Sequence, residues 1–144
     1  MKNILITIAT ILAMANANSQ ISFKDIDEDP EHPFAQKVAI VDENGVTTFV
    51  ENQDEDKMIL GHGHDFYIVY RKSTNKIYVK NPKGVVLSGI EVPEGRYVEA
   101  VNYDNMTDHE QFDALTSKAA FTIVDPETEH RTVYNKHCKR IGGY

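Results

Sequence analysis

Residues 38–50 read VAIVDENGVTTFV, and this stretch decides the class of fold. Two runs rich in β-branched residues flank Asn44-Gly45, and both of these residues tolerate the positive φ angles of a two-residue type I′ turn. The stretch therefore predicts an antiparallel β-hairpin. The register that this turn sets joins two pairs of residues, Ile40 with Phe49 and Val41 with Thr48.

Short extended runs separated by turns continue toward the C-terminus, and one helix interrupts them. Thr107 and Glu110 form a capping box, which predicts a helix over residues 108–118. Phe112, Leu115 and Ala119 share one face of that helix, which we expect to lean on the sheet. The sequence thus predicts an α+β fold: a mainly antiparallel sheet of about eight short strands, which could be partly closed, with one short helix packed on it.

The N-terminus has the order of a cleavable export signal. Lys2 supplies one positive charge, residues 4–14 are apolar and uncharged, and Ala15-Asn16-Ala17 matches the small–x–small cleavage pattern. The apolar run is shorter than the about 20 residues that a spanning helix needs. We therefore expect a signal peptide over residues 1–17, cleavage near Ala17, and a secreted or periplasmic protein with no membrane span after cleavage.

The segment after the leader is acidic and poor in apolar residues. We expect residues 18–36 to be a poorly ordered lead-in, because such composition buries little surface. A single β-rich globular domain is then expected over residues 37–141, a normal length for one domain.

The charge and the cysteine count limit the partners. Removal of Lys2 leaves 14 Lys and Arg against 22 Asp and Glu, a net charge of −8. Such a chain repels nucleic acid unless its basic residues segregate. The basic residues do cluster at Lys136, His137, Lys139 and Arg140, which solubility alone can explain. Cys138 is the only cysteine, so no intramolecular disulfide forms.

His62-Gly63-His64-Asp65 is the one motif that supports a chemical argument. On an extended backbone, His62 and His64 point the same way and could bind one Zn or Cu ion, with Asp65 beside them. The third ligand would be one of five other residues: His32, His109, His130, His137 or Cys138. The alternative is a polar turn whose histidines have no metal.

The same fragment resembles part of the metallo-β-lactamase signature. That motif continues with a histidine where this chain has Phe66, and the chain is too short for the fold, so we do not assign the family. Pairing of Cys138 with a histidine as nucleophile and base is a further alternative.

No catalytic signature is present, so whether the chain is an enzyme stays open, with a non-enzymatic role favoured. We expect a binding or inhibitory module of the cell envelope or medium, whose partner is an envelope protein or polymer; the alternative is an envelope metal-binding protein that uses His62 and His64.

Overall fold

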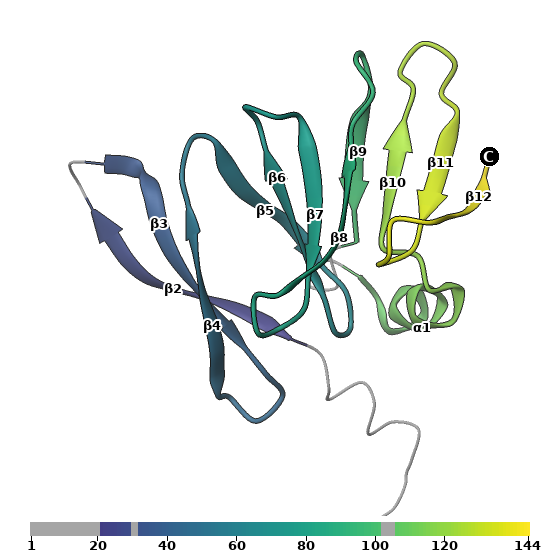
Figure 1. The fold of residues 1–144 in the computed structure, drawn as a ribbon. Coiled ribbons are helices and arrows are strands. Elements are labelled where there is room, and N and C mark those ends of the chain that lie inside the picture. The colour runs from purple at the N-terminus through teal and green to yellow at the C-terminus, as the bar shows by residue number, and fades with distance from the viewer. Residues whose placement is uncertain (1–20, 30–31, 102–105) are drawn as a thin grey trace, which may run out of the picture.

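The computed structural model describes residues 21–29, 32–101 and 106–144, and all bounds and counts below refer to these residues. They form eleven strands in three antiparallel sheets, with one helix (Figure 1). The N-terminal sheet consists of β2 (Ser22–Asp29), β3 (His32–Val41) and β4 (Thr47–Gln53). The central sheet has the order β5 (Lys57–His62), β6 (Tyr67–Arg71), β7 (Lys76–Lys80) and β8 (Val86–Glu91). The C-terminal sheet has the order β12 (Arg140–Gly143), β11 (Arg131–Tyr134), β10 (Phe121–Val124) and β9 (Tyr97–Ala100).

The predicted class, mainly antiparallel β-sheet with one short helix, is confirmed. The expected eight strands are too few, and within the described residues the strands form three open sheets rather than one partly closed sheet. Each sheet is built from neighbours in sequence. The helix lies between the paired strands β9 and β10, and short connections join the other antiparallel neighbours. In the same part of the chain, no helix is long and apolar enough to cross a membrane.

The lead-in expected to be poorly ordered over residues 18–36 contains strand β2 and the beginning of β3. The reason is that two apolar residues, Ile21 and Phe23, alternate with polar ones just before a run of acidic residues that dominates the composition. Ile21 is buried, and Phe23, two residues later, packs against the same core. Residues at i and i+2 of a strand share a face, so two apolar side chains are enough to dock this end of β2. Strand pairing therefore begins at Ser22, whereas the bounds expected for the lead-in and the domain stay predictions.

The central sheet is buried on both faces. In β6, Tyr67 and Val69 pack with Ile21 and Ile40 of the N-terminal segment and sheet. Ile68, between them, belongs to a second core with residues of the C-terminal sheet. The alternation of side chains in a strand explains this division, since neighbouring residues point to opposite faces. The three sheets accordingly follow one another across the molecule, with the central sheet in the middle (Figure 1).

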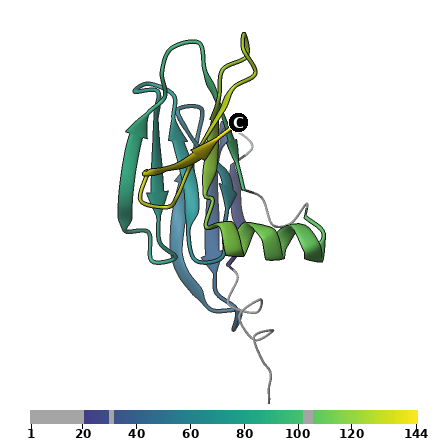
Figure 2. The same ribbon diagram turned by 90° about the vertical axis from the view of Figure 1, so that its right-hand side faces the viewer.

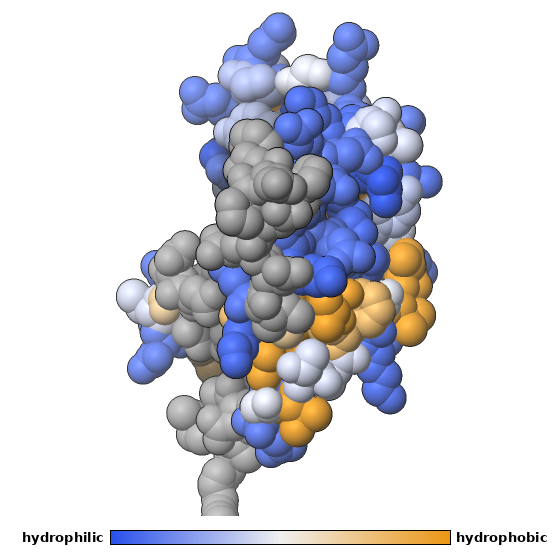
Figure 3. All heavy atoms as spheres, turned by 90° about the vertical axis from the view of Figure 1, so that its left-hand side faces the viewer, coloured by the Kyte–Doolittle hydropathy of each residue, from blue (hydrophilic) through white to orange (hydrophobic). Residues whose placement is uncertain are grey.

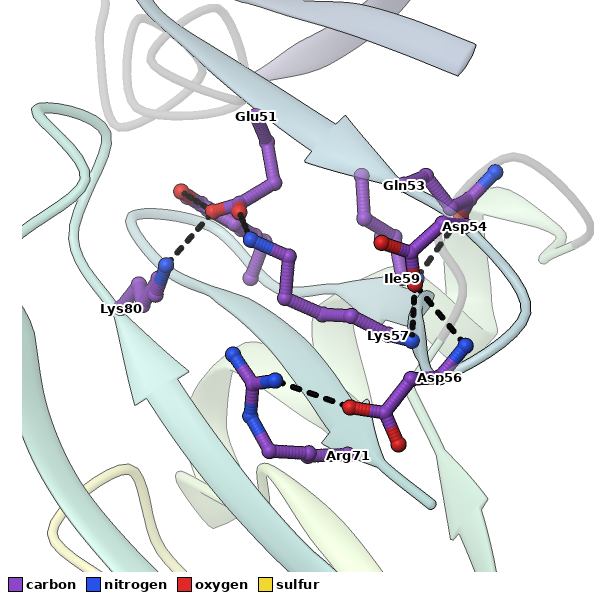
Figure 4. Close-up of polar contacts among 9 residues, drawn as sticks. Glu51, Gln53, Asp54, Asp56, Lys57, Ile59, Arg71 and Lys80 are labelled. Atoms are coloured by element: carbon purple, nitrogen blue, oxygen red, sulfur yellow. Dashed lines mark hydrogen bonds and ion pairs between the residues drawn. The ribbon is translucent and has the colours of Figure 1, made fainter. Parts of the chain in front are cut away.

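A buried carboxylate joins the N-terminal and central sheets. Glu51 of β4 forms ion pairs with Lys57 and Lys80, whose Nζ atoms lie 2.8 and 2.7 Å from its two oxygens (Figure 4). The hydroxyl of Tyr67 donates a third bond of 2.8 Å. Burial acts to raise the pKa of Glu51, but these donors outweigh it and hold the pKa below its ordinary value. Burial, together with the neighbouring Glu51 carboxylate, raises the pKa of Tyr67.

The predicted first hairpin exists, and the pairing of Ile40 with Phe49 is confirmed. The turn itself differs, because Val41 pairs with Thr47 rather than Thr48. Only Gly45 has a positive φ, of 79°, whereas a type I′ turn requires positive φ at two residues. The N–H of Asp42 donates to the carbonyl of Val46, which leaves a three-residue loop in place of the expected two-residue turn.

The same loop recurs twice. Asn81 and Asn135 take the place of Asp42, and in all three loops the side-chain oxygen accepts two backbone N–H bonds. The residue three positions later has a positive φ. It is glycine in two loops, Gly45 and Gly84, but Cys138 in the third, with φ 58°. A non-glycine residue is disfavoured there, since its Cβ crowds the backbone.

Helix α1 (Asp108–Ser117) has the predicted capping box. Thr107 Oγ1 accepts the N–H of Glu110 at 3.2 Å, and Glu110 Oε1 accepts the N–H of Thr107 at 3.1 Å. Its expected packing differs, because Phe112 is 63 % exposed. The helix lies at one end of the C-terminal sheet instead of across a face, as the two perpendicular views show (Figures 1 and 2). Its own caps, rather than a broad apolar contact, therefore stabilise its first turn.

Candidate functional site

The two histidines of the predicted metal motif lie in different environments. His62 ends β5 and is fully buried, with its ring edge-on to Phe23 at a centroid distance of 4.9 Å. Its Nδ1 lies 3.1 Å from the carbonyl oxygen of Gly63. His64 and Asp65 are the two central residues of the turn that joins β5 to β6, because the N–H of Gly63 donates to the carbonyl of Phe66. The metal hypothesis assumed an extended backbone through the motif, but the backbone turns at His64 and Asp65.

The flanking glycines serve packing. A Cβ on Gly63 would collide with the ring of Phe66, and a Cβ on Gly61 would collide with the carbonyl oxygen of Val101. Glycine at these positions lets the aromatic ring and the neighbouring chain approach the backbone closely. The Gly-His-Gly-His pattern thus has a steric explanation within the hairpin.

In the described residues, no group of three or more His, Cys, Asp or Glu side chains is placed to hold a metal ion. Of the predicted set, Asp65 is instead paired with a lysine, as described below. The Zn or Cu site at His62, His64 and Asp65 accordingly stays a prediction from sequence.

His64 and Asp65 do contribute to a pocket of about 450 Å³. Its wall comes from three segments that are far apart in the sequence: the β5–β6 turn, the end of α1, and the β11–β12 loop. The lining residues are His64, Asp65, Phe66, Ala114, Lys118, Ala119, Asn135, Lys136 and His137. Pockets of roughly 300–1,000 Å³ are typical of small-molecule sites.

Local backbone features fix each wall of this pocket. At the end of α1, Lys118 adopts a left-handed conformation, with φ 61°, and its N–H donates to the carbonyl of Ala114. In the β11–β12 loop, Asn135 Oδ1 accepts the N–H groups of His137 and Lys139 at 2.9 and 3.1 Å. The walls are therefore formed by a helix cap and by a hydrogen-bonded loop, both of which are set by local sequence.

An ion pair crosses the pocket edge. Lys136 Nζ lies 2.8 Å from Asp65 Oδ2 and joins the β11–β12 loop to the β5–β6 turn. The two side chains keep 36 % and 51 % of their surface exposed. An ion pair this exposed contributes little to stability, so its geometry serves mainly to hold the two charges at the pocket.

One lining residue carries a buried side-chain nitrogen without a hydrogen-bond partner among the described residues. Nδ1 of His64 is buried and makes no hydrogen bond within the described part of the chain. Buried polar atoms in proteins are nearly always bonded, and an ordered water molecule is a common partner where the protein supplies none. Phe66 and two alanines, Ala114 and Ala119, supply the apolar part of the lining.

The charge of the lining is opposite to that of the chain. Lys118 and Lys136 outnumber Asp65, which gives +1 when both histidines are neutral, whereas the whole chain carries −7. Lys136 and His137 belong to the basic cluster near the C-terminus. The fold therefore brings part of that cluster to the turn that carries the histidine motif.

Cys138 lies beside this pocket in sequence but not in its lining. Ser88 Oγ donates to its sulfur at 3.2 Å, and the thiol packs against the core between the central and C-terminal sheets. Burial raises the pKa of Cys138, and the bond from Ser88 only partly offsets this rise. The neighbouring His137 is exposed. The described structure thus gives no support to a nucleophile–base pair at these two residues.

Two other surface features are weaker candidates. Smaller hollows of about 280 and 200 Å³ lie beside Tyr97 and Phe23, respectively. Exposed apolar residues also occur in the β3–β4 and β7–β8 connections, at Val46 and Val85. Hydrophobic surface gathers in one region of the face shown in Figure 3. Neither feature combines a full-sized cavity with an unsatisfied polar atom.

No protein-family model, curated protein or solved structure matches this chain. The assignment of a function therefore depends on the pocket itself. Sequence reasoning identified four of the nine lining residues, His64 and Asp65 in the histidine motif and Lys136 and His137 in the basic cluster. It related the two groups only by naming His137 as one of five possible third ligands.

Proposed function

We propose that this chain is an exported, non-enzymatic binding module that holds a small organic ligand in the pocket between the β5–β6 turn, the end of α1 and the β11–β12 loop. One observation carries the proposal: a pocket of about 450 Å³ in which His64, two lysines and three apolar residues from separate segments of the chain lie together.

The composition of the pocket supports binding of a small molecule. Phe66, Ala114 and Ala119 offer apolar surface, and a few polar groups converge beside them. This combination of an apolar wall with a small number of placed polar groups is typical of ligand sites. This proposal therefore replaces the partner expected from sequence, an envelope protein or polymer, with a small organic molecule.

Export is the second part of the proposal, and the leader supports it. The predicted signal peptide lies in residues 1–17, outside the described residues, so its order of charge, apolar run and small residues carries the argument. Mass spectrometry of the protein recovered from its native cells tests it. We expect a chain that begins at or near Asn18 and is found outside the cytosol. An intact chain beginning at Met1 inside the cell would contradict export.

The binding role is tested by titrating the ¹⁵N-labelled protein with three aromatic probes of different charge: benzoate, benzamide and benzylamine. We expect at least one probe to shift the backbone amides of Phe66, Ala119 and Asn135 in a saturable way. Ala114→Phe fills the pocket and should remove these shifts. Thr116→Phe, on an exposed position of the same helix, is the matched control and should leave them. Absence of saturable shifts with all three probes would contradict the proposed function.

A further inference from the structure

We infer that the pocket selects small organic anions, and that the ligand's charged group replaces Asp65 as the partner of Lys136. This inference rests on the proposed function and names the class of ligand for the same site. In the ligand-free protein, Asp65 then acts as an internal substitute for the anion, because its carboxylate occupies the lysine at 2.8 Å.

Charge is the first argument. The lining carries a net +1 with neutral histidines, in a chain whose overall charge is −7. A local excess of positive charge in an acidic protein concentrates anions at that place and repels cations. The one carboxylate of the lining, Asp65, is already neutralised by Lys136, so it offers no free site for a cation.

The second argument concerns the exchange of partners. A buried ion pair would resist separation, but the Asp65 and Lys136 side chains are 51 % and 36 % exposed. Exposed ion pairs contribute little to the free energy of folding, and water can solvate the Asp65 carboxylate once it is released. Lys136 can therefore pass from Asp65 to a ligand carboxylate at small cost. The flexible four-carbon stem of lysine allows this movement without a change in the backbone.

The third argument fixes the orientation of the ligand. The C-terminal end of α1 carries a partial negative charge, which offsets the positive charge of Lys118 at its C-cap. Lys136, whose charge no helix end offsets, is thus the group that receives the anion. The apolar body of the ligand then lies against Phe66, Ala114 and Ala119.

The test measures the dissociation constants of benzoate and its neutral analogue benzamide by calorimetry, for the wild type and four variants. In the wild type, benzoate should bind about tenfold more tightly than benzamide, equivalent to about 1.4 kcal/mol. Asp65→Asn removes the internal competitor and should tighten benzoate severalfold without changing benzamide. Lys136→Met should abolish the preference, and Lys136→Arg should retain it. Lys139→Met removes a nearby lysine that does not line the pocket, and should change neither constant.

The possible outcomes separate this inference from the proposed function. Equal binding of benzoate and benzamide in the pocket would overturn anion selection and leave the binding role standing. Weaker benzoate binding by Asp65→Asn would overturn the role of Asp65 as a competitor. No binding of any probe would overturn both proposals. Because Asp65 and Lys136 are surface residues, their variants should keep the wild-type urea midpoint, which verifies that each remains folded.

Discussion

Asp65 and Lys136 stand 71 positions apart in the sequence and form an ion pair of 2.8 Å across the edge of the pocket. The pair joins the turn that carries the histidine motif to the loop that carries the basic cluster. It thereby brings together the histidine motif and the basic cluster, the two groups that the sequence analysis singled out. The proposed ligand site depends on this relationship, because the lysine of the pair is the group that would receive an anion.

Replacement of Glu51 by Gln should destabilise the protein strongly. The change leaves Lys57 and Lys80 without their shared carboxylate at the contact between two sheets. Removal of one partner from a buried pair costs roughly 3–5 kcal/mol, and we expect about 2–3 kcal/mol here because both lysines are partly exposed. Urea unfolding measures the loss. Glu99→Gln, which breaks the exposed pair with Arg131, is the control and should change the stability little.

The contribution of Glu51 should also depend on pH. Its pKa is lower in the folded protein than in the unfolded chain, so protons bind the unfolded chain more readily. The stability difference between wild type and Glu51→Gln is then full above the ordinary pKa of about 4.5, and it is lost as the pH falls through the folded pKa. Unfolding free energies measured from pH 7 downward test this. A difference that grows on acidification would contradict the sign.

Two glycines with the same backbone conformation should respond differently to substitution. Gly45 and Gly84 both have φ 79° in equivalent loops. A Cβ on Gly45 meets nothing nearby, whereas one on Gly84 collides with the ring of Phe49. Gly45→Ala should cost about 1 kcal/mol for the left-handed conformation, and Gly84→Ala about 1–3 kcal/mol more. Thermal or urea unfolding measures the loss of stability in each variant. Equal losses would contradict this prediction and show that the ring of Phe49 moves aside freely.

The thiol of Cys138 should react slowly in the folded protein. Burial raises its pKa, and the thiolate is the reactive form. The rate of alkylation by iodoacetamide, followed against pH, should therefore rise with a midpoint above the ordinary value of 9.0. The same protein in concentrated urea provides the reference. A folded thiol that reacts as fast as the unfolded one would show that Cys138 is not protected by the Ser88 contact and the core.

Local signals predicted the first hairpin and the capping box, because turn residues and helix caps act within a few positions of the chain. The turn at Asn44-Gly45 was assigned to the wrong type. The sequence shows two chain-reversing residues but does not show which of them takes the positive φ. The deciding feature is Asp42, whose side chain accepts the N–H groups of Asn44 and Val46. Asn81 and Asn135 precede the equivalent loops in the same way, so the pattern could have been recognised.

Two features depended on contacts between distant segments. Strand β2 was missed because its acids dominate the composition, while its docking depends on Ile21 and Phe23 meeting a core that lies elsewhere in the sequence. The pocket was missed for a similar reason, since its walls come from three separated segments. The available signal was the contrast of a basic cluster within an acidic chain. That contrast was attributed to solubility, because sequence alone could not show that the cluster meets His64.

The most direct test of the ligand site is the position of bound benzoate in solution. Intermolecular NOEs between the benzoate ring protons and the isotope-labelled protein report contacts within a few ångströms. The account predicts NOEs to the methyl groups of Ala114 and Ala119 and to the ring of Phe66. NOEs to the exposed apolar residues near Val46 and Val85 instead, or no intermolecular NOE at saturating benzoate, would contradict it.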